Sequence, residues 1–202
     1  MEFRDILARR RMHRAFEPDP IPREVVERIA RTVRRAPSGG FSQGQSIVVV
    51  VDETLRRRIA EAFDEASYVA GGAQPFISTA PVHLVVCANE RLYHDRYNEP
   101  DKLAATGGVE IHWPVPYWFV DAGAAMMLIL LAALDEGLAA AFVGHPDQER
   151  ILRELLALPP DVVPIGVALV GKPAPDPFAD RGTSRLASRR RPLPDVVHWD
   201  QW

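Results

Sequence analysis

Two groups of arginine residues are the most evident candidates for binding a ligand. They lie near the two ends of the sequence and comprise Arg9, Arg10, Arg11 and Arg14, and Arg189, Arg190 and Arg191. A guanidinium group matches phosphate oxygens in a bidentate manner, so either group could hold a phosphate ester. Arginine-rich segments are also common on solvated surfaces, and the arginines alone leave both interpretations open.

A short glycine-containing loop is the second candidate, with the sequence Pro37-Ser38-Gly39-Gly40-Phe41-Ser42-Gln43. Glycine lets a ligand approach the backbone closely, and serine and glutamine side chains offer hydrogen bonds that orient it. A plain connection between a helix and a strand has the same composition. The loop therefore indicates a ligand site only together with other features.

Signatures of self-contained catalysis are missing from the chain. It has no GxSxG elbow and no GxxxxGK[ST] phosphate loop, and its six histidines lack the spacing of a zinc site. Cys87 and His83 lie in an apolar run, where we expect both to be buried core residues. We predict no metal and no catalytic side chain, so that a cofactor carries the chemistry.

Composition narrows the class of protein. The 202 residues suit one domain, with 47% apolar and 25% charged residues and a formal net charge of −3. This charge gives no reason to expect nucleic acid or a membrane as a partner. A single cysteine excludes an intrachain disulfide, and the N-terminal segment has no continuous apolar stretch. We therefore expect a cytoplasmic protein.

Hydrophobic periodicity predicts alternating helices and strands. The helices are expected at 2–10, 22–35, 53–66, 121–136 and 147–157, and the strands at 47–51, 81–87, 139–143 and 162–170. The first two strands are continuous apolar runs, which predicts burial on both faces. Helix 121–136 is apolar nearly all round and is predicted to be central, with Gly137 as its C-cap. This pattern favours an α+β or α/β sandwich.

Two segments do not follow this alternation. Residues 89–117 combine aromatic and charged side chains, which is typical of a lid or a binding segment. Residues 172–202 form a tail rich in proline and arginine that ends in large apolar residues. We expect this tail to lie across another surface, in its own subunit or in a partner.

In their order along the chain, these features resemble the FMN-dependent nitroreductase superfamily. The resemblance covers nearly the whole chain except 89–117, and each motif on its own is weak. The motifs are Arg10-Arg11-x-x-Arg14-x-Phe16, then Ala36-Pro37-Ser38-Gly39-Gly40-x-Ser42-Gln43, the helix from Asp121, the run Glu136 to Gly144, the strand Val163 to Gly171 followed by Lys172-Pro173, and Arg190-Arg191-Pro192-Leu193.

The resemblance implies a single domain over residues 1–202, folded as an α+β three-layer α/β/α sandwich. It also implies a homodimer that exchanges the tail 172–202 and binds FMN at its interface. The expected activity is that of a flavoprotein oxidoreductase with NADH or NADPH as electron donor. A small nitroaromatic, quinone or other conjugated acceptor would be reduced by a ping-pong mechanism.

The same resemblance assigns roles to individual residues. Arg10, Arg11 and Arg14 match positions that contact the phosphate, ribityl chain and pyrimidine edge of FMN, and Arg190 and Arg191 match positions at the phosphate. Pro37, Ser38 and Gln43 match a loop that lines the flavin from the other subunit, and the backbone of Gly144 matches a position near flavin N5. Within the predicted lid 89–117, flat aromatic faces suit the stacking of a planar acceptor. The lid residues expected to do so are Tyr97, Trp113 and Tyr117.

Three positions depart from the family pattern. Met12 replaces the usual Ser, Phe41 replaces Asn, and Gly44-Gln45 replaces Pro-Trp. Aromatic residues at position 41 occur in the flavin-destroying BluB-type branch, but that branch has Asp at position 12 and Ser at position 144. The departures keep two alternatives open. One is a flavin-binding or storage protein without turnover, and the other is a specialised reaction such as flavin fragmentation, deiodination or dehydrogenation.

Overall fold

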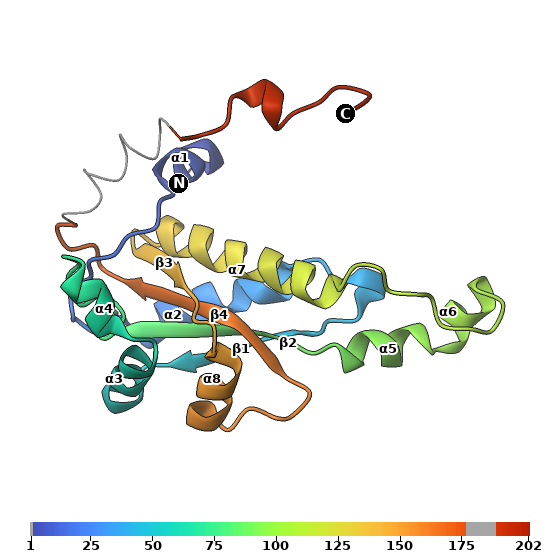
Figure 1. Ribbon diagram of the computed structural model, residues 1–202, viewed down its shortest axis with the longest axis horizontal. Coiled ribbons are helices and arrows are strands. Elements are labelled where there is room, and N and C mark those ends of the chain that lie inside the picture. The colour runs from blue at the N-terminus through green and yellow to red at the C-terminus, as the bar shows by residue number, and fades with distance from the viewer. Residues whose placement is uncertain (1, 177–188) are drawn as a thin grey trace.

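The core of the protein is a four-stranded antiparallel sheet with strand order β1-β2-β4-β3 (Figure 1). The computed structural model describes residues 2–176 and 189–202. The strands are β1 (Gln45–Val50), β2 (Val82–Ala88), β3 (Ala139–Val143) and β4 (Val163–Gly171). β2 and β4 lie at the centre, so every residue of β2 is buried, whereas β1 and β3 form the edges.

Helices cover both faces of this sheet. Side chains alternate between the faces of a strand, so Leu84 and Val86 of β2 join one core and Val85 and Cys87 join the other. The first core is closed by α2 (Arg23–Arg31) and α7 (Tyr117–Asp135), and the second by α3 (Glu53–Ala62) and α8 (Gln148–Leu156). The predicted three-layer α/β/α sandwich is confirmed.

Most element boundaries agree with the predictions to within a few residues, but two details are wrong. β1 is not buried on both faces, because it lies at the edge of the sheet and leaves Ser46 and Val49 exposed. The helix predicted at 53–66 ends after α3, since Asp64 adopts a left-handed conformation with φ of 54°. A separate helix, α4 (Glu65–Ala70), follows it.

The segment 89–117 contains two short helices that the sequence pattern does not predict, α5 (Arg91–Tyr97) and α6 (Pro100–Ala105). They extend beyond the sheet at one end (Figure 1). Tyr93 is the only buried residue of α5, and α6 buries none, so neither helix shows an apolar stripe in its sequence.

α7 is the central helix, as predicted, and contacts all four strands. By length and composition alone it could cross a membrane, but a core helix of this kind passes the same test. One side of α7 faces away from the sheet and leaves apolar residues exposed. These residues, called the α7 stripe below, are Phe119, Val120, Gly123 and Met127.

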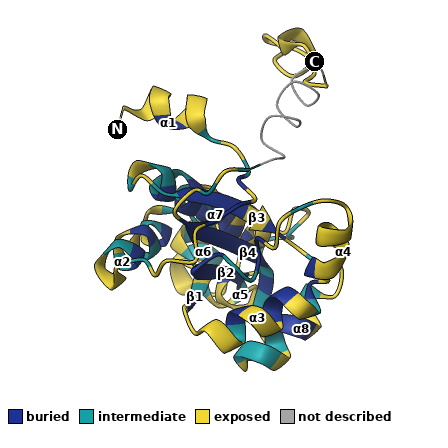
Figure 2. Cartoon of the chain, turned by 90° about the vertical axis from the view of Figure 1, so that its left-hand side faces the viewer, coloured by how far each residue is buried: buried dark blue, intermediate teal, exposed yellow. Residues whose placement is uncertain are grey.

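The two ends of the chain lie at the periphery of the sandwich, where α1 contacts α7. α1 (Phe3–Arg9) and residues 189–202, which contain the short 3-10 helix η3 (Leu193–Asp195), project from the body, and most of their residues are exposed (Figures 1 and 2). Trp199 is 86% exposed and Trp202 97% exposed. Large apolar side chains this exposed are typical of a segment that binds another surface.

Candidate functional site

Residues 12–17 are held along one edge of the sheet. The His13 amide donates to the Ala140 carbonyl oxygen at 3.1 Å, and the Phe142 amide donates to Met12 Sδ at 3.3 Å. Farther along, the Glu17 amide donates to the Lys172 carbonyl oxygen at 3.0 Å. These bonds fix the preceding arginines beside the start of β3.

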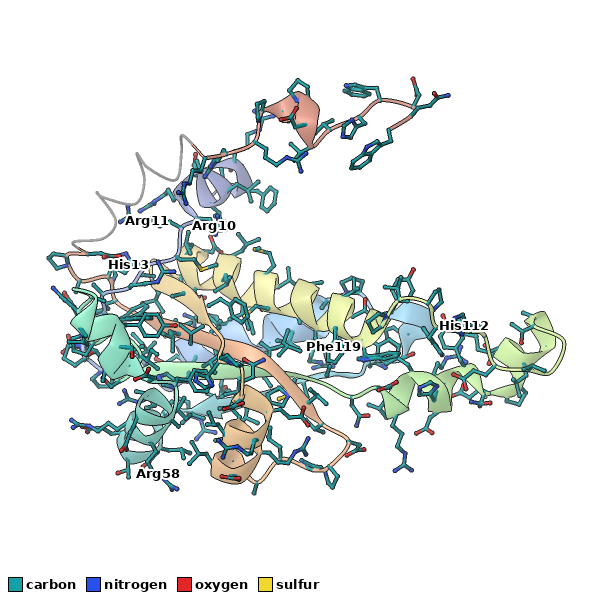
Figure 3. All side chains as sticks on the ribbon, viewed as in Figure 1. Arg10, Arg11, His13, Arg58, His112 and Phe119 are labelled. Carbon is teal, nitrogen blue, oxygen red and sulfur yellow. The ribbon has the colours of Figure 1, made fainter. Side chains whose placement is uncertain are left out.

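Three of the predicted cofactor residues, Arg10, Arg11 and Arg190, line one cavity of about 410 Å³. Arg10 and Arg11 extend from the end of α1 (Figure 3), and Arg190 comes from the C-terminal segment. Alanine residues of β3 form part of the wall, and none of the residues lining the cavity is acidic. Within the described residues these three guanidinium groups have no acidic partner. We call this cavity the arginine pocket.

Arg14 and Arg191 do not line the arginine pocket. The Arg14 side chain is exposed, and its backbone amide donates to Asp176 Oδ2 at 3.0 Å. Arg191 Nη2 donates to the carbonyl oxygen of Asp195 in its own segment. In this structure neither side chain joins the other three arginines.

Gly144 follows the last residue of β3 and therefore lies at the opposite end of this strand from the arginine pocket. At about 3.3 Å per residue, Ala139 and Gly144 are about 17 Å apart. A second cavity of about 400 Å³ begins directly after Gly144, at His145, and is also lined by Phe119 of α7 and the start of β4. The edge of β3 thus connects two cavities of different chemistry.

The loop that contains Pro37, Ser38 and Gln43 lies elsewhere, beside the N-terminal part of α7. Ser38 Oγ accepts a hydrogen bond from the Gln43 amide at 3.0 Å. The Gly39 amide donates to Asp121 Oδ2 at 2.9 Å, which ties the loop to α7. The arginine pocket adjoins Gly137 at the other end of this helix, about 24 Å away at 1.5 Å per residue.

The backbone of this loop is constrained. Phe41 and Gln43 have positive φ angles of 62° and 53°, a conformation that costs a residue with a Cβ about 1 kcal/mol or more. Phe41 is nevertheless 75% exposed, so packing against its own chain does not explain its position. Strained and exposed residues of this kind concentrate at binding surfaces.

Asp121 and Tyr93 form a buried pair that sequence analysis did not single out. Tyr93 Oη donates to Asp121 Oδ2 at 2.6 Å, and Tyr93 is fully buried. Burial, with a hydrogen bond to the Asp121 carboxylate, raises the pKa of Tyr93 well above its usual value. The sequence feature that could have indicated this pair is Asp121 itself, an acidic residue near the start of an otherwise apolar helix.

Replacing Tyr93 by phenylalanine should lower the free energy of unfolding by about 2 kcal/mol, because Asp121 loses a charge-assisted hydrogen bond in a buried site. Urea denaturation measures this change. Tyr68→Phe, at a half-exposed tyrosine of α4, is the matched control and should have little effect. Equal effects of the two substitutions would contradict the structural role of the buried pair.

The three predicted lid residues lie together in an aromatic cluster. The ring of Trp113 is 4.6 Å from that of Tyr97 and 6.3 Å from that of Tyr117, measured between centroids. Trp113 also contacts Tyr93 and Trp118 through edge-to-face geometry. Tyr97 also lies close to Gly40. The aromatic cluster therefore lies beside the loop 37–43.

Charged side chains hold this cluster in place. Glu110 Oε1 accepts hydrogen bonds from Trp113 Nε1 at 2.7 Å and from His94 at 2.6 Å. Arg96 donates to the Gly40 carbonyl oxygen at 3.0 Å and to Asp101 through two nitrogens. The carboxylate of Glu110, followed by that of Glu90, raises the pKa of His94 above its usual value.

The aromatic cluster should loosen as the pH rises through the raised pKa of His94. A raised pKa in the folded state means that the stabilising contribution is complete below the unfolded value of 6.5 and is lost above the folded value. Tryptophan fluorescence followed from pH 5 to 9 should show this transition, and His94→Gln should remove it. A transition that persists in the variant would assign it to another group.

Cys87 and His83 are core residues, as predicted. Both are fully buried, and burial raises the pKa of the Cys87 thiol to about 11 and lowers that of His83 to about 4. The Cys87 thiol is therefore protonated near neutral pH, and burial keeps both side chains away from a substrate. Among the described residues no group of histidine, cysteine and acidic side chains has the arrangement of a metal site.

Comparison with known proteins places these features in context. The model of the nitroreductase family matches residues 7–172. A protein of Archaeoglobus fulgidus, provisionally named NADH dehydrogenase/NAD(P)H nitroreductase, is 29% identical over 96% of this chain and 94% of its own length. The FMN reductase (NAD(P)H) of Bacillus subtilis is 32% identical over 80% of this chain and 61% of its own length. The structure of B. megaterium NfrA1 matches with a TM-score of 0.72 and 25% identity, over 98% of this chain and 74% of that one.

Proposed function

Because this chain belongs to the nitroreductase family, we propose that it reduces a small quinone, nitroaromatic or other conjugated acceptor in two alternating half-reactions. It is an NAD(P)H-dependent oxidoreductase with FMN as cofactor, in line with the names of its relatives. When bound, FMN supplies the redox chemistry, taking electrons from NAD(P)H and passing them to the acceptor. The residues of this chain bind, orient and shield the reactants.

The arginine pocket fits the phosphate group of FMN. Arg10, Arg11 and Arg190 bring three cations to a cavity that no carboxylate lines. Bringing unpaired cations together is unfavourable unless an anion compensates them, and guanidinium groups bind phosphate through paired hydrogen bonds. We assign these three residues to the phosphate and place Arg14 and Arg191 at the margin of the pocket.

The cavity beside Gly144 fits the acceptor end of the site. FMN carries its phosphate and its ring at opposite ends, and the two cavities lie at opposite ends of β3. We assign the Gly144 backbone to the ring. Phe119 offers an aromatic face in this cavity, and Tyr97, Trp113 and Tyr117 are proposed as the lid that excludes water from the acceptor.

A homodimer would complete the site. The loop residues Pro37, Ser38 and Gln43 lie at the other end of α7 from the arginine pocket, so one chain does not bring both sets together. The exposed α7 stripe and the exposed tail residues Trp199 and Trp202 supply apolar surface for a partner. We propose that two copies pack through α7, exchange their tails, and each lend the loop 37–43 to the other.

The chain is proposed to act as one domain over residues 1–202 and in the cytoplasm. The two cores share a single sheet, which gives the sandwich no internal boundary. Cys87, the only cysteine in the sequence, is buried and reduced, which suits a reducing compartment.

The observation that carries this proposal is the meeting of Arg10, Arg11 and Arg190 in one cavity. The test is the absorbance spectrum of the protein with FMN, before and after anaerobic addition of NADH and NADPH. Flavin absorbance that bleaches with either nucleotide is the expected result. Flavin that stays oxidised would favour storage or a specialised reaction, and a protein that binds no FMN would overturn the proposal.

A further inference from the structure

Three polar side chains line the cavity at the carboxyl end of β3, and one of them, His145, has a ring nitrogen that forms no hydrogen bond among the described residues. The other polar residues that line it are Gln148, which donates to the Pro164 carbonyl oxygen at 3.2 Å, and Glu149, which pairs with Arg153 at 3.0 Å. Among the described residues none accepts a hydrogen bond from His145 Nε2. This nitrogen is therefore available to a ligand.

The backbone fixes which ring nitrogen of His145 carries the proton. The Asp147 amide donates to His145 Nδ1 at 3.1 Å, so Nδ1 accepts this hydrogen bond with its lone pair. In the neutral imidazole the proton then resides on Nε2, which becomes a hydrogen-bond donor. The Asp147 amide thus sets the tautomer without any charged partner.

Neighbouring groups also hold the position of His145. Gln148 Oε1 accepts from the His145 amide at 3.3 Å, while its amide nitrogen bonds to β4, so one side chain joins the histidine backbone to the sheet. The ring of Phe63 lies 5.6 Å from the imidazole, between centroids. A donor held in this way loses little freedom when a ligand binds.

We propose that His145 Nε2 donates a hydrogen bond to the acceptor oxygen on which negative charge develops during reduction. The inference rests on the proposed function, because His145 directly follows Gly144 and lines the cavity assigned to the acceptor. A 1,4-quinone gains two electrons and two protons to become a hydroquinone. One proton arrives with the electron pair as hydride and the second comes from water, while His145 retains its own proton and stabilises the oxygen.

The acceptors taken by this cavity are therefore those with a polar oxygen on a planar ring. Phe119 contributes an aromatic face, and Figure 3 shows this residue near the amino end of α7. A quinone carbonyl or a nitro group meets both requirements. Ferricyanide meets neither, because it takes one electron without a proton and without a hydrogen bond to carbon-bound oxygen.

Two substitutions distinguish the role of His145 Nε2 as a hydrogen-bond donor from the structural role of the His145 ring. In His145→Asn the amide oxygen can take the place of Nδ1 and accept from Asp147, but no donor reaches the position of Nε2. In His145→Gln the amide nitrogen takes the place of Nε2. We expect kcat/KM for 1,4-naphthoquinone to fall by about 10- to 100-fold in His145→Asn, with partial recovery in His145→Gln.

Ferricyanide reduction should fall less than quinone reduction in His145→Asn, because ferricyanide needs no hydrogen bond from Nε2. Both rates should stay unchanged in the control Arg58→Gln, on the exposed surface of α3. If His145→Asn reduces the quinone as fast as the unaltered protein, the inference is wrong although the proposed function stands. If the unaltered protein fails to bleach, the proposed function itself fails.

A direct measurement on the unaltered protein gives a second test. Nitrogen-15 NMR of the histidine side chains distinguishes the two neutral tautomers and does not depend on turnover or on the folding of a variant. The expected spectrum assigns the proton of His145 to Nε2. A proton on Nδ1 would overturn the inference.

Discussion

Replacing both Arg10 and Arg190 by glutamine should raise the dissociation constant of FMN by at least about 100-fold. Each guanidinium is proposed to make charge-assisted hydrogen bonds to the phosphate, which contribute about 1.5–3 kcal/mol per bond, and about 1.4 kcal/mol corresponds to a factor of ten. Because both side chains line the arginine pocket and have no acidic partner among the described residues, their loss should leave the fold intact. Titration of the apoprotein, followed by flavin fluorescence, measures the change.

Riboflavin, which lacks the phosphate, makes this prediction specific. The double variant should bind riboflavin as well as the unaltered protein does, so the preference for FMN over riboflavin should disappear. Added salt should weaken FMN binding by the unaltered protein more than by the variant, because fewer charge pairs remain to be screened. Equal losses for FMN and riboflavin would show that these arginines do not bind the phosphate, and Arg58→Gln controls for the change in net charge.

Elements whose residues repeat with a clear period could be predicted from the sequence. The central helix could be predicted because its apolar side chains pack against all four strands. The strand at 139–143 could be predicted because most of its apolar residues are buried in the two cores. The position of β1 at an edge could not be predicted, since an apolar run such as Ile47 to Val51 does not reveal how many neighbours the strand has. The helices α5 and α6 could not be predicted from hydrophobic periodicity, because they bury almost no side chains.

The candidate site, too, could be predicted from the sequence only in part. The arginines and the loop 37–43 could be identified by residue type and order. Their grouping depends on tertiary contacts, such as the bond between the Met12 sulfur and the Phe142 amide, which places Arg10 and Arg11 beside β3. The Tyr93–Asp121 pair and the tautomer of His145 depend on single hydrogen bonds that no spacing encodes.

A lysine in place of Met127 should convert the protein to a monomer. Met127 lies within the α7 stripe and is 43% exposed, with apolar neighbours one turn away. Burying an unpaired ammonium group in an apolar interface costs several kcal/mol, which is enough to dissociate a dimer at micromolar concentration. Sedimentation equilibrium measures the mass of the particle. Val69→Lys, at an α4 residue that is 42% exposed, is the matched control and should leave the assembly unchanged.

The monomer should also lose FMN, and this consequence separates a shared site from a self-contained one. If the loop 37–43 of one copy completes the arginine pocket of the other, Met127→Lys weakens FMN binding as strongly as it weakens assembly. A monomer that binds FMN with unaltered affinity would contradict the shared site while leaving the dimer interface on α7 supported. A variant that remains dimeric would instead exclude the α7 stripe as the interface.

Mixing two variants that each bind FMN poorly tests directly whether the site is shared between two copies. One chain carries Arg10→Gln and Arg190→Gln, and the other carries Ser38→Ala and Gln43→Ala, so that neither forms a complete site with its own kind. In a mixed two-fold dimer with shared sites, one site receives both defects and the other receives none, which restores FMN binding in about one quarter of all sites. Sites built from a single chain would stay defective in every combination. The recovery of tight FMN binding after dissociation and reassembly therefore follows only if each pocket takes its arginines and its loop from different copies.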